Sequence, residues 1–229
     1  MDSSRVIAID GPAGSGKSTL ARRLAAALGW RFLDTGVLYR AMAAVALERG
    51  LASAPPEDLV RFALGLDLDV KTGSDQSRVT VGGRDVTGLL RTPEVSTLAS
   101  RFASLAEARE SVKGIQRRLG SSGRLVTEGR DQGTAIFPEA RLKFFLTAAP
   151  EARAERRYRE LLARGRDDSP EAILAEIKAR DRQDQERETD PLKEAPDAFR
   201  VDSTALSEDE VLSLMLARAR EVFGKEVGA

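Results

Sequence analysis

Residues 11–18, with the sequence GPAGSGKS, constrain the fold more than any other segment of this 229-residue chain. They fit the pattern G-x-x-x-x-G-K-[ST], and they follow an apolar, β-branched run at 5–10 and precede apolar residues at helical spacing at 17–28. In this strand–loop–helix setting, glycines let successive backbone N–H groups turn toward phosphate oxygens at the positive end of the helix. The segment therefore predicts a phosphate-binding loop in which Lys17 contacts the β- and γ-phosphates and the Ser18 hydroxyl binds Mg²⁺.

Four further short runs alternate with helical patterns in the same way. They predict strands at residues 31–33, 124–128, 141–147 and 199–201, and the helical spacing predicts helices at about 37–49 and 207–222. Strands that alternate with helices favour a parallel sheet with helices on both faces. We therefore expect an α/β fold with a five-stranded parallel sheet.

Two segments interrupt this alternation. Residues 55–97 contain three short runs separated by Gly-Ser-Asp and Gly-Gly turns, which predict antiparallel strands in an inserted subdomain. Residues 151–190 carry 10 basic and 12 acidic side chains and keep apolar residues at helical spacing. This composition is consistent with two exposed helices joined by ion pairs, or with a mobile lid that closes over a polyphosphate. The candidate lid arginines are Arg156, Arg157, Arg164 and Arg166.

The composition excludes several kinds of chemistry and partner. The chain has no cysteine and no histidine, so disulfides, thiol nucleophiles, Ser-His-Asp triads and zinc sites with nitrogen or sulfur ligands are excluded. Its 29 Arg and 7 Lys are balanced by 36 acidic residues, and this zero net charge disfavours a nucleic-acid partner. The longest stretch without a charged residue is seven residues, and the N-terminus lacks a signal pattern. We therefore expect a cytoplasmic protein without a membrane span, and a monomer because no apolar stripe is left over.

Polar residues follow the second predicted strand, at 34–40. Because the carboxyl ends of adjacent parallel strands line one crevice, we expect Asp34 and Thr35 to face the phosphate-binding loop. Arg40 would then direct a cation at a second anion bound across that crevice. The alternative is a helix N-cap followed by a core Tyr39 and a surface Arg40.

Two further groups are candidates for the same crevice. Residues 129–131 (Gly-Arg-Asp) follow the strand predicted at 124–128, although a capped turn would have the same sequence. Arg180, Asp184 and Arg187 recur at spacings i, i+4 and i+7, which predicts one face of a helix. An exposed ladder of ion pairs would show the same spacing.

Five segments carry a resemblance to the bacterial cytidylate kinase family. GPAGSGKST, LDTGVLYRAMA, LRTPEVSTLAS, TEGRDQGTAIFP and IKARDRQDQER occur in the order and at the intervals of that family, from Ile7 to the last helix. LRTPEVS, and GRDxGT together with RDxxD, are the most specific of these signatures. The resemblance implies ATP-dependent phosphorylation of CMP, and usually dCMP, with Mg²⁺. It also implies a single P-loop kinase domain over residues 1–229, with a core (1–54, 98–150 and 186–229), a monophosphate-binding insert (about 55–97) and a helical lid (about 151–185).

The resemblance also implies roles for individual residues. ATP would be held by Gly11, Pro12, Ala13, Gly14, Ser15, Gly16, Lys17, Ser18 and Thr19, with Ser18 at the metal. The cytosine would be read by Ser100, Arg109 and Asp131, and the acceptor phosphate would be clamped by Arg40, Arg130 and Arg187. Tyr39, Arg180 and Asp184 would border the sugar, with Thr35 beside them, and Lys17, Arg130 and Arg187 would take part in catalysis. Glu128 stands where many relatives have Asp, which leaves its part in Mg²⁺ binding open.

Three alternative functions remain at this level. Another P-loop small-molecule kinase, acting on UMP, AMP or a hydroxylated metabolite, would have the same loop. A nucleotide-binding regulator without turnover would also keep it. A nucleic-acid-binding module is weaker, because a basic face and an aromatic platform are both missing from a chain with 5% aromatic residues.

Overall fold

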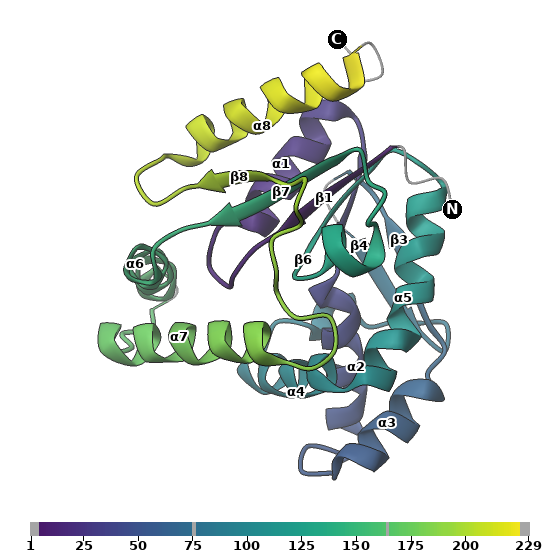
Figure 1. The fold of residues 1–229 in the computed structure, drawn as a ribbon. Coiled ribbons are helices and arrows are strands. Elements are labelled where there is room, and N and C mark those ends of the chain that lie inside the picture. The colour runs from purple at the N-terminus through teal and green to yellow at the C-terminus, as the bar shows by residue number, and fades with distance from the viewer. Residues whose placement is uncertain (1–4, 75–76, 164, 225–229) are drawn as a thin grey trace.

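The computed structural model describes residues 5–74, 77–163 and 165–224, and its main element is a five-stranded sheet (Figure 1). The strands lie in the order β2 (Arg31–Asp34), β6 (Leu125–Gly129), β1 (Val6–Asp10), β7 (Leu142–Thr147) and β8 (Phe199–Asp202). Each neighbouring pair is parallel. The predicted α/β class and five-stranded parallel sheet are therefore confirmed, with strand bounds within one or two residues of those expected.

Helices cover both faces of this sheet. On one face, α1 (Lys17–Leu28) and α8 (Glu208–Phe223) share a buried apolar cluster with Ile7 and Ile9 of β1. On the other face, α2 (Gly36–Glu48), α4 (Pro93–Ser104) and α5 (Ala106–Ser121) share a second cluster with Val6 and Ala8. Successive residues of β1 thus face opposite layers, and all five are buried, which explains why this strand reads as a continuous apolar run.

The segment before α4 contains three short strands, as the turn signals predicted. β3 (Leu68–Thr72), β4 (Ser77–Val81) and β5 (Arg84–Asp85) form an antiparallel sheet, preceded by α3 (Pro56–Leu64) and followed by the 3₁₀ turn η1 (Thr87–Leu89). The helix α3 was not among the predicted elements. Val70, Val79 and Val86 belong to the same buried cluster as Ala8. The segment therefore shares the main core, and its role as a monophosphate-binding insert stays a prediction.

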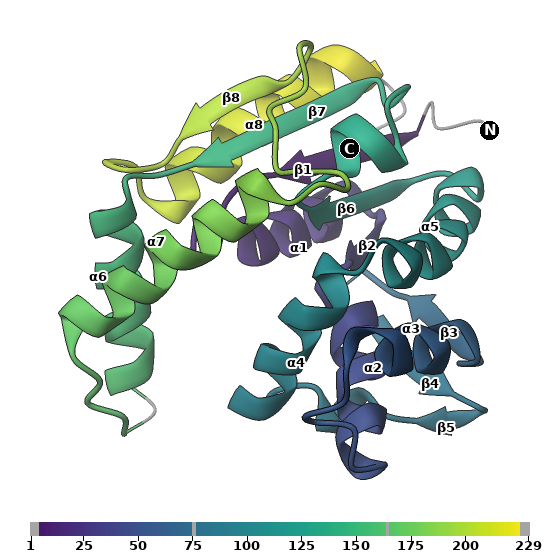
Figure 2. The same cartoon turned by 60° about the horizontal axis from the view of Figure 1, so that its bottom comes forward.

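The charged segment at 151–190 forms two helices, α6 (Pro150–Leu162) and α7 (Pro170–Glu186). Figure 2 shows this pair on one side of the molecule, with α2, α3 and α4 on the other side. Ala154, Leu161, Ile173 and Ile177 form a small buried cluster of their own between the two helices. Arg159 and Glu155 make an ion pair at the surface of α6, as the exposed-helix interpretation predicted. Neither observation tests closure of a lid, which stays a prediction.

Among the residues that the structure describes, no helix combines the length and the apolar character that crossing a bilayer requires.

Two glycines of α5 provide a matched test of how this layer packs. A Cβ on Gly120 would lie 2.3 Å from Cε1 of the buried Phe137, whereas a Cβ on Gly114 meets no other part of the described chain within 4 Å. We expect Gly120→Ala to lower the free energy of unfolding by about 1–3 kcal/mol through overpacking. Gly114→Ala should raise it by about 0.5–1 kcal/mol, because alanine is the better helix former. Urea unfolding followed by circular dichroism measures both, and shifts of the same sign would contradict this packing.

Candidate active site

The loop between β1 and α1 has the close backbone packing that its glycines predict. A Cβ on Gly11 would lie 1.9 Å from the carbonyl oxygen of Leu146 in β7, so only glycine fits there. Gly16, directly before α1, has a φ of 87°, in the left-handed region that glycine adopts without steric cost. The first turn of α1 therefore starts at the loop, and its N–H groups have no partners within the helix. Such a helix start favours an anion.

Lys17 crosses this loop. Its side chain is buried, and Nζ donates a hydrogen bond of 2.8 Å to the carbonyl oxygen of Pro12. Burial, together with the guanidinium of Arg130, lowers the pKa of Lys17 well below its ordinary value. A phosphate anion in the loop would offset both effects, because it supplies a negative partner for the ammonium group.

Ser18 and Glu128 form the oxygen-rich part of the site. The Ser18 hydroxyl donates a hydrogen bond of 2.6 Å to Oε1 of Glu128, which lies near the end of β6. Burial and the neighbouring Asp34 carboxylate raise the pKa of Glu128. A hydroxyl and a carboxylate are the ligand types that Mg²⁺ prefers, and Mg²⁺ commonly uses one or two protein ligands together with substrate phosphates. The pair therefore fits Mg²⁺, and Glu128 joins Ser18 as a candidate ligand. Within the described ranges, no group of three or more His, Cys, Asp or Glu side chains could hold a metal ion.

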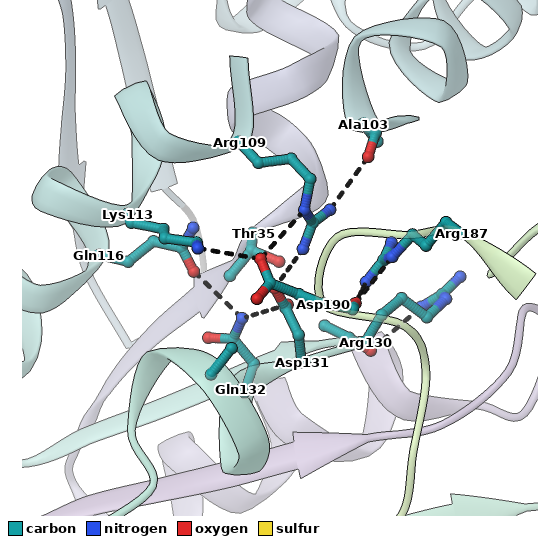
Figure 3. Close-up of polar contacts among 12 residues, drawn as sticks. Thr35, Ala103, Arg109, Lys113, Gln116, Arg130, Asp131, Gln132, Arg187 and Asp190 are labelled. Atoms are coloured by element: carbon teal, nitrogen blue, oxygen red, sulfur yellow. Dashed lines mark hydrogen bonds and ion pairs between the residues drawn. The ribbon is translucent and has the colours of Figure 1, made fainter. Parts of the chain in front are cut away.

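Arg109 and Asp131 form a buried ion pair beside the loop (Figure 3). Nη2 of Arg109, in α5, donates to Oδ2 of Asp131, which is the second residue after β6. Nη1 of Arg109 donates to the carbonyl oxygen of Ala103 at 3.0 Å, and Nε donates to Oδ2 of Asp190 at 3.3 Å. These contacts fix the plane of the guanidinium, and they join α5 to the ends of β6 and α7.

Arg40, Arg130 and Arg187 are also oriented by contacts within the protein. Nε of Arg130 donates to Asp184 at 2.6 Å, and Nη2 of Arg40 donates to Asp34. α7 ends at Glu186, so Arg187 lies just beyond it with an extended backbone (φ −61°, ψ 142°). Its N–H still donates to the carbonyl oxygen of Gln183 at 3.2 Å, and its Nη1 lies 3.9 Å from Oδ1 of Asp184. Arg180, Asp184 and Arg187 therefore all lie at the same cleft, as their spacing predicted. Nε of Arg187 also donates to the carbonyl oxygen of Asp190 at 2.7 Å.

These residues surround one cleft of about 770 Å³. Its walls include the following predicted residues: Ala13, Gly14, Ser15, Gly16, Lys17, Ser18, Thr19, Thr35, Tyr39, Arg40, Ser100, Arg109, Arg130, Asp131, Arg180, Asp184 and Arg187. Gly11 and Pro12 lie at the start of the loop, with Gly11 packed against β7. The structure thus brings together the residues expected to bind ATP and those expected to bind the acceptor nucleotide, while the role of each residue stays a prediction.

The candidate lid arginines differ in their positions. Arg156 and Arg157 line the cleft, and Arg156 also donates to the hydroxyl of Ser203 at 3.1 Å. Arg166 pairs with Asp168 at 2.9 Å. Arg164 lies outside the described residues. Arg153, which was not predicted, is a buried residue of α6. It donates to the carbonyl oxygen of Ala13 at 2.9 Å and pairs with Asp181 of α7.

A buried amide network lies behind Asp131 and was not predicted. Nε2 of Gln132 donates to Oδ1 of Asp131 at 3.2 Å and to Oε1 of Gln116 at 3.1 Å, and its Oε1 accepts from the Thr127 hydroxyl at 2.9 Å. Because a carboxylate only accepts, the amide nitrogen must be the atom that faces Asp131. The position of Gln132 beside Asp131 in the sequence was the sole signal, and it does not reveal the contacts with Gln116 and Thr127.

Asp10 connects the end of β1 to the same segment. Its carboxylate accepts hydrogen bonds from the backbone N–H groups of Gln132 (2.8 Å) and Gly133 (2.7 Å), in the π-helical turn η2 (Gln132–Ile136). Burial raises the pKa of Asp10 to about 7, although these hydrogen bonds oppose the shift. Asp10 therefore anchors the segment that carries Arg130 and Asp131.

The loop at the end of β1, with Lys17 across it and a parallel sheet beneath it, places the chain among the P-loop nucleotide-binding proteins. A family model described as cytidylate kinase matches residues 7–221. The chain belongs to the cytidylate kinase family, as its sequence signatures indicated.

Individual relatives agree with this assignment. A cytidylate kinase of Carboxydothermus hydrogenoformans is 43% identical over 220 residues, which are 96% of this chain and 97% of the relative. A cytidylate kinase of Exiguobacterium sibiricum is 45% identical over 207 residues, 90% of this chain and 93% of the relative. A solved structure of an uncharacterized protein from Eubacterium ventriosum has a TM-score of 0.50 and 13% identity, covering 95% of this chain and 99% of that one. This last likeness shows a shared fold alone.

The shifted pKa of Asp10 predicts how stability depends on pH. A carboxyl group whose folded pKa is raised from 3.8 to about 7 contributes stability that is present below the lower value and is lost as pH rises through the higher one. The unfolding free energy of the wild type, relative to Asp10→Asn, should therefore fall between these pH values by at most about 1.4 kcal/mol per pH unit. Urea unfolding of both proteins across this range measures the difference. A difference that is constant or rises with pH would contradict the buried state of Asp10.

Proposed function

We propose that the protein transfers the γ-phosphate of ATP to CMP or dCMP, giving ADP and CDP or dCDP. One observation carries this proposal for a chain of this family: the phosphate-binding loop and the Arg109–Asp131 pair line the same cleft. An oxygen of the acceptor phosphate forms the new bond to the γ-phosphorus, and the bond to the oxygen of the β-phosphate breaks.

The Arg109–Asp131 pair suits cytosine better than uracil. Cytosine presents an exocyclic amine as donor, with a ring nitrogen and a carbonyl oxygen as acceptors, and a carboxylate and a guanidinium complement that pattern. Uracil reverses it, with a carbonyl in place of the amine and an N–H in place of the ring acceptor. A carbonyl facing the Asp131 carboxylate would leave two acceptors opposed, which is costly in a buried site. We therefore propose that Asp131 and Arg109, with Ser100 beside them, select the base.

The phosphate-handling residues supply electrostatic stabilisation. The acceptor phosphate is already an anion, so the transfer needs no general base to deprotonate it. Arg40 and Arg130 are each held by a carboxylate, and Arg187 by a backbone carbonyl, so they are oriented before the acceptor arrives. Lys17 would hold the β- and γ-phosphates of ATP. Mg²⁺, held by Ser18 and Glu128 together with the phosphates, would neutralise part of the phosphate charge when bound.

Several expectations about the whole molecule belong to the same proposal. We propose that residues of about 55–97 form the monophosphate-binding insert and that α6 and α7, at about 151–185, form a lid over the phosphates. The separate apolar cluster of α6 and α7 and the arginines of α6 on the cleft wall support a lid. We also propose a cytoplasmic protein, and one without a nucleic-acid partner because its net charge is zero. We propose a monomer because the described residues of one chain surround the cleft.

A substrate panel tests the proposed function directly. ADP release is measured with ATP and each of CMP, dCMP, UMP, AMP and shikimate. We expect kcat/KM for CMP and dCMP to exceed that for UMP and AMP by about 100-fold or more. A preference for UMP, AMP or shikimate would replace the proposed acceptor. Binding of ATP and CMP with no ADP formed would identify a nucleotide-binding regulator instead.

Removal of the Lys17 ammonium should abolish most of the rate. We expect Lys17→Met to lower kcat by about 1,000-fold while ATP still binds weakly, because the charge acts mainly on the transferring phosphate. Lys71→Met, at an exposed position of β3, is the matched control and should change kcat less than twofold. Steady-state kinetics and ATP titration measure both. A loss of tenfold or less for Lys17→Met would remove Lys17 from the transfer step.

Asp131 should decide between the two pyrimidines. We expect Asp131→Asn to lower kcat/KM for CMP by about 100-fold and to narrow the CMP-to-UMP ratio, because an amide can both donate and accept. KM for ATP should stay within twofold, which serves as the internal control for folding. An unchanged CMP-to-UMP ratio in this variant would exclude Asp131 from base selection.

A further inference from the structure

The turn after α7 brings one aspartate against two arginines of the cleft. Oδ2 of Asp190 accepts hydrogen bonds from Nε of Arg109 (3.3 Å) and from Nζ of Lys113 (3.0 Å), one turn further along α5 (Figure 3). The backbone carbonyl of Asp190 accepts from Nε of Arg187 at 2.7 Å. Asp190 therefore contacts a proposed base-reading arginine through its side chain and a proposed phosphate-clamping arginine through its backbone.

The backbone of Asp190 is held in an uncommon conformation. Its φ is 48°. Among the described residues, Arg124 is the only other non-glycine residue with a positive φ. Aspartate and asparagine adopt this left-handed region more easily than most residues, but it still carries a cost. Such a conformation persists when surrounding contacts hold it, and it occurs often at functional sites. Here Arg109, Lys113 and Arg187 supply those contacts.

The charges around Asp190 are balanced. Lys113 is largely buried and reaches Asp190 and Glu110, while Arg109 lies between the carboxylates of Asp131 and Asp190. Partial burial raises the pKa of Asp190, but hydrogen bonds from Lys113 and the charge of Arg109 lower it overall. Asp190 is thus an anion at neutral pH.

Asp190 limits how the Arg109 guanidinium can turn. The group has five N–H donors, of which Asp190, Ala103 and Asp131 take one each from Nε, Nη1 and Nη2. One N–H therefore remains on each Nη atom. Without the contact at Nε, only the contacts of Nη1 with Ala103 and of Nη2 with Asp131 would hold the guanidinium, and the directions of the two remaining N–H donors would be less tightly fixed. Arg109 and Arg187 line the cleft, and Asp190 holds both.

We infer that Asp190 is a positioning residue that aligns Arg109 and Arg187 with each other, so that base recognition and phosphate clamping are set in one geometry before the acceptor nucleotide binds. This inference rests on the proposed function. Two parts of Asp190 have separate roles: the carboxylate orients Arg109, and the backbone carbonyl orients Arg187. Substitutions that affect one part and not the other can therefore separate the two effects.

Asp190→Asn removes the charge and keeps both the preference for left-handed backbone and the carbonyl that holds Arg187. We expect KM for CMP to rise about tenfold and the CMP-to-UMP ratio to fall, with kcat and KM for ATP within twofold of the wild type. Asp190→Ala, which disfavours the left-handed backbone, should lower kcat as well. Asp197→Asn is the matched control, since Asp197 lies in the same connection to β8 and pairs with Lys143 at 2.8 Å. All its constants should stay within twofold.

The outcomes separate this inference from the proposed function. If the wild type phosphorylates CMP and Asp190→Asn leaves KM for CMP unchanged, the inference is overturned alone. An equal rise of KM for CMP and ATP, or a lower melting temperature with unchanged kinetics, would show a structural role and would also overturn it. A wild type that does not phosphorylate CMP would overturn the proposed function itself.

Discussion

The parallel pairing of β6 between β1 and β2 is the constraint on which the site depends. In this register Asp10 lies opposite Gly129 and Asp34 lies opposite Glu128, so all three strands end at one edge. The loops that follow them must then meet. Ser18 reaches Glu128, Thr35 donates to the carbonyl oxygen of Glu128 at 2.9 Å, and Asp10 accepts the N–H groups that follow Asp131. The ends of these three strands thus position both the residues proposed to bind ATP and those proposed to bind the acceptor nucleotide.

The cleft orients its cations by pairing them. Arg40, Arg109 and Arg130 each meet an aspartate of the protein, and such buried or half-buried pairs add little to stability, because desolvation offsets much of the attraction. Their effect is to fix where each guanidinium lies before a ligand binds. Lys17 and Arg187 lie at the same cleft, where anionic nucleotides would supply further negative charge. Although the net charge of the chain is zero, several cationic side chains are concentrated at this cleft.

The sequence predicted those features that depend on local pattern. The glycine loop between 5–10 and 17–28, and the strand-end positions of Thr35 and Asp131, followed from rules about neighbouring residues. The order of the strands was not predicted, because parallel pairing joins segments far apart in the chain. Asp190 and Gln132 were missed for the same reason: Asp190 lies 81 residues from Arg109, and the partners of Gln132 include Gln116 on another element. The resemblance to a family supplied the roles that spacing alone left open.

A crystal structure with CMP bound tests the central claim most directly, because the claim concerns where one nucleotide lies. The account predicts the exocyclic amine of cytosine within hydrogen-bond distance of the Asp131 carboxylate, and the phosphate of CMP in contact with Arg130 and Arg187. CMP bound with its phosphate in the loop at Lys17, or with its base away from Asp131 and Arg109, would contradict the account.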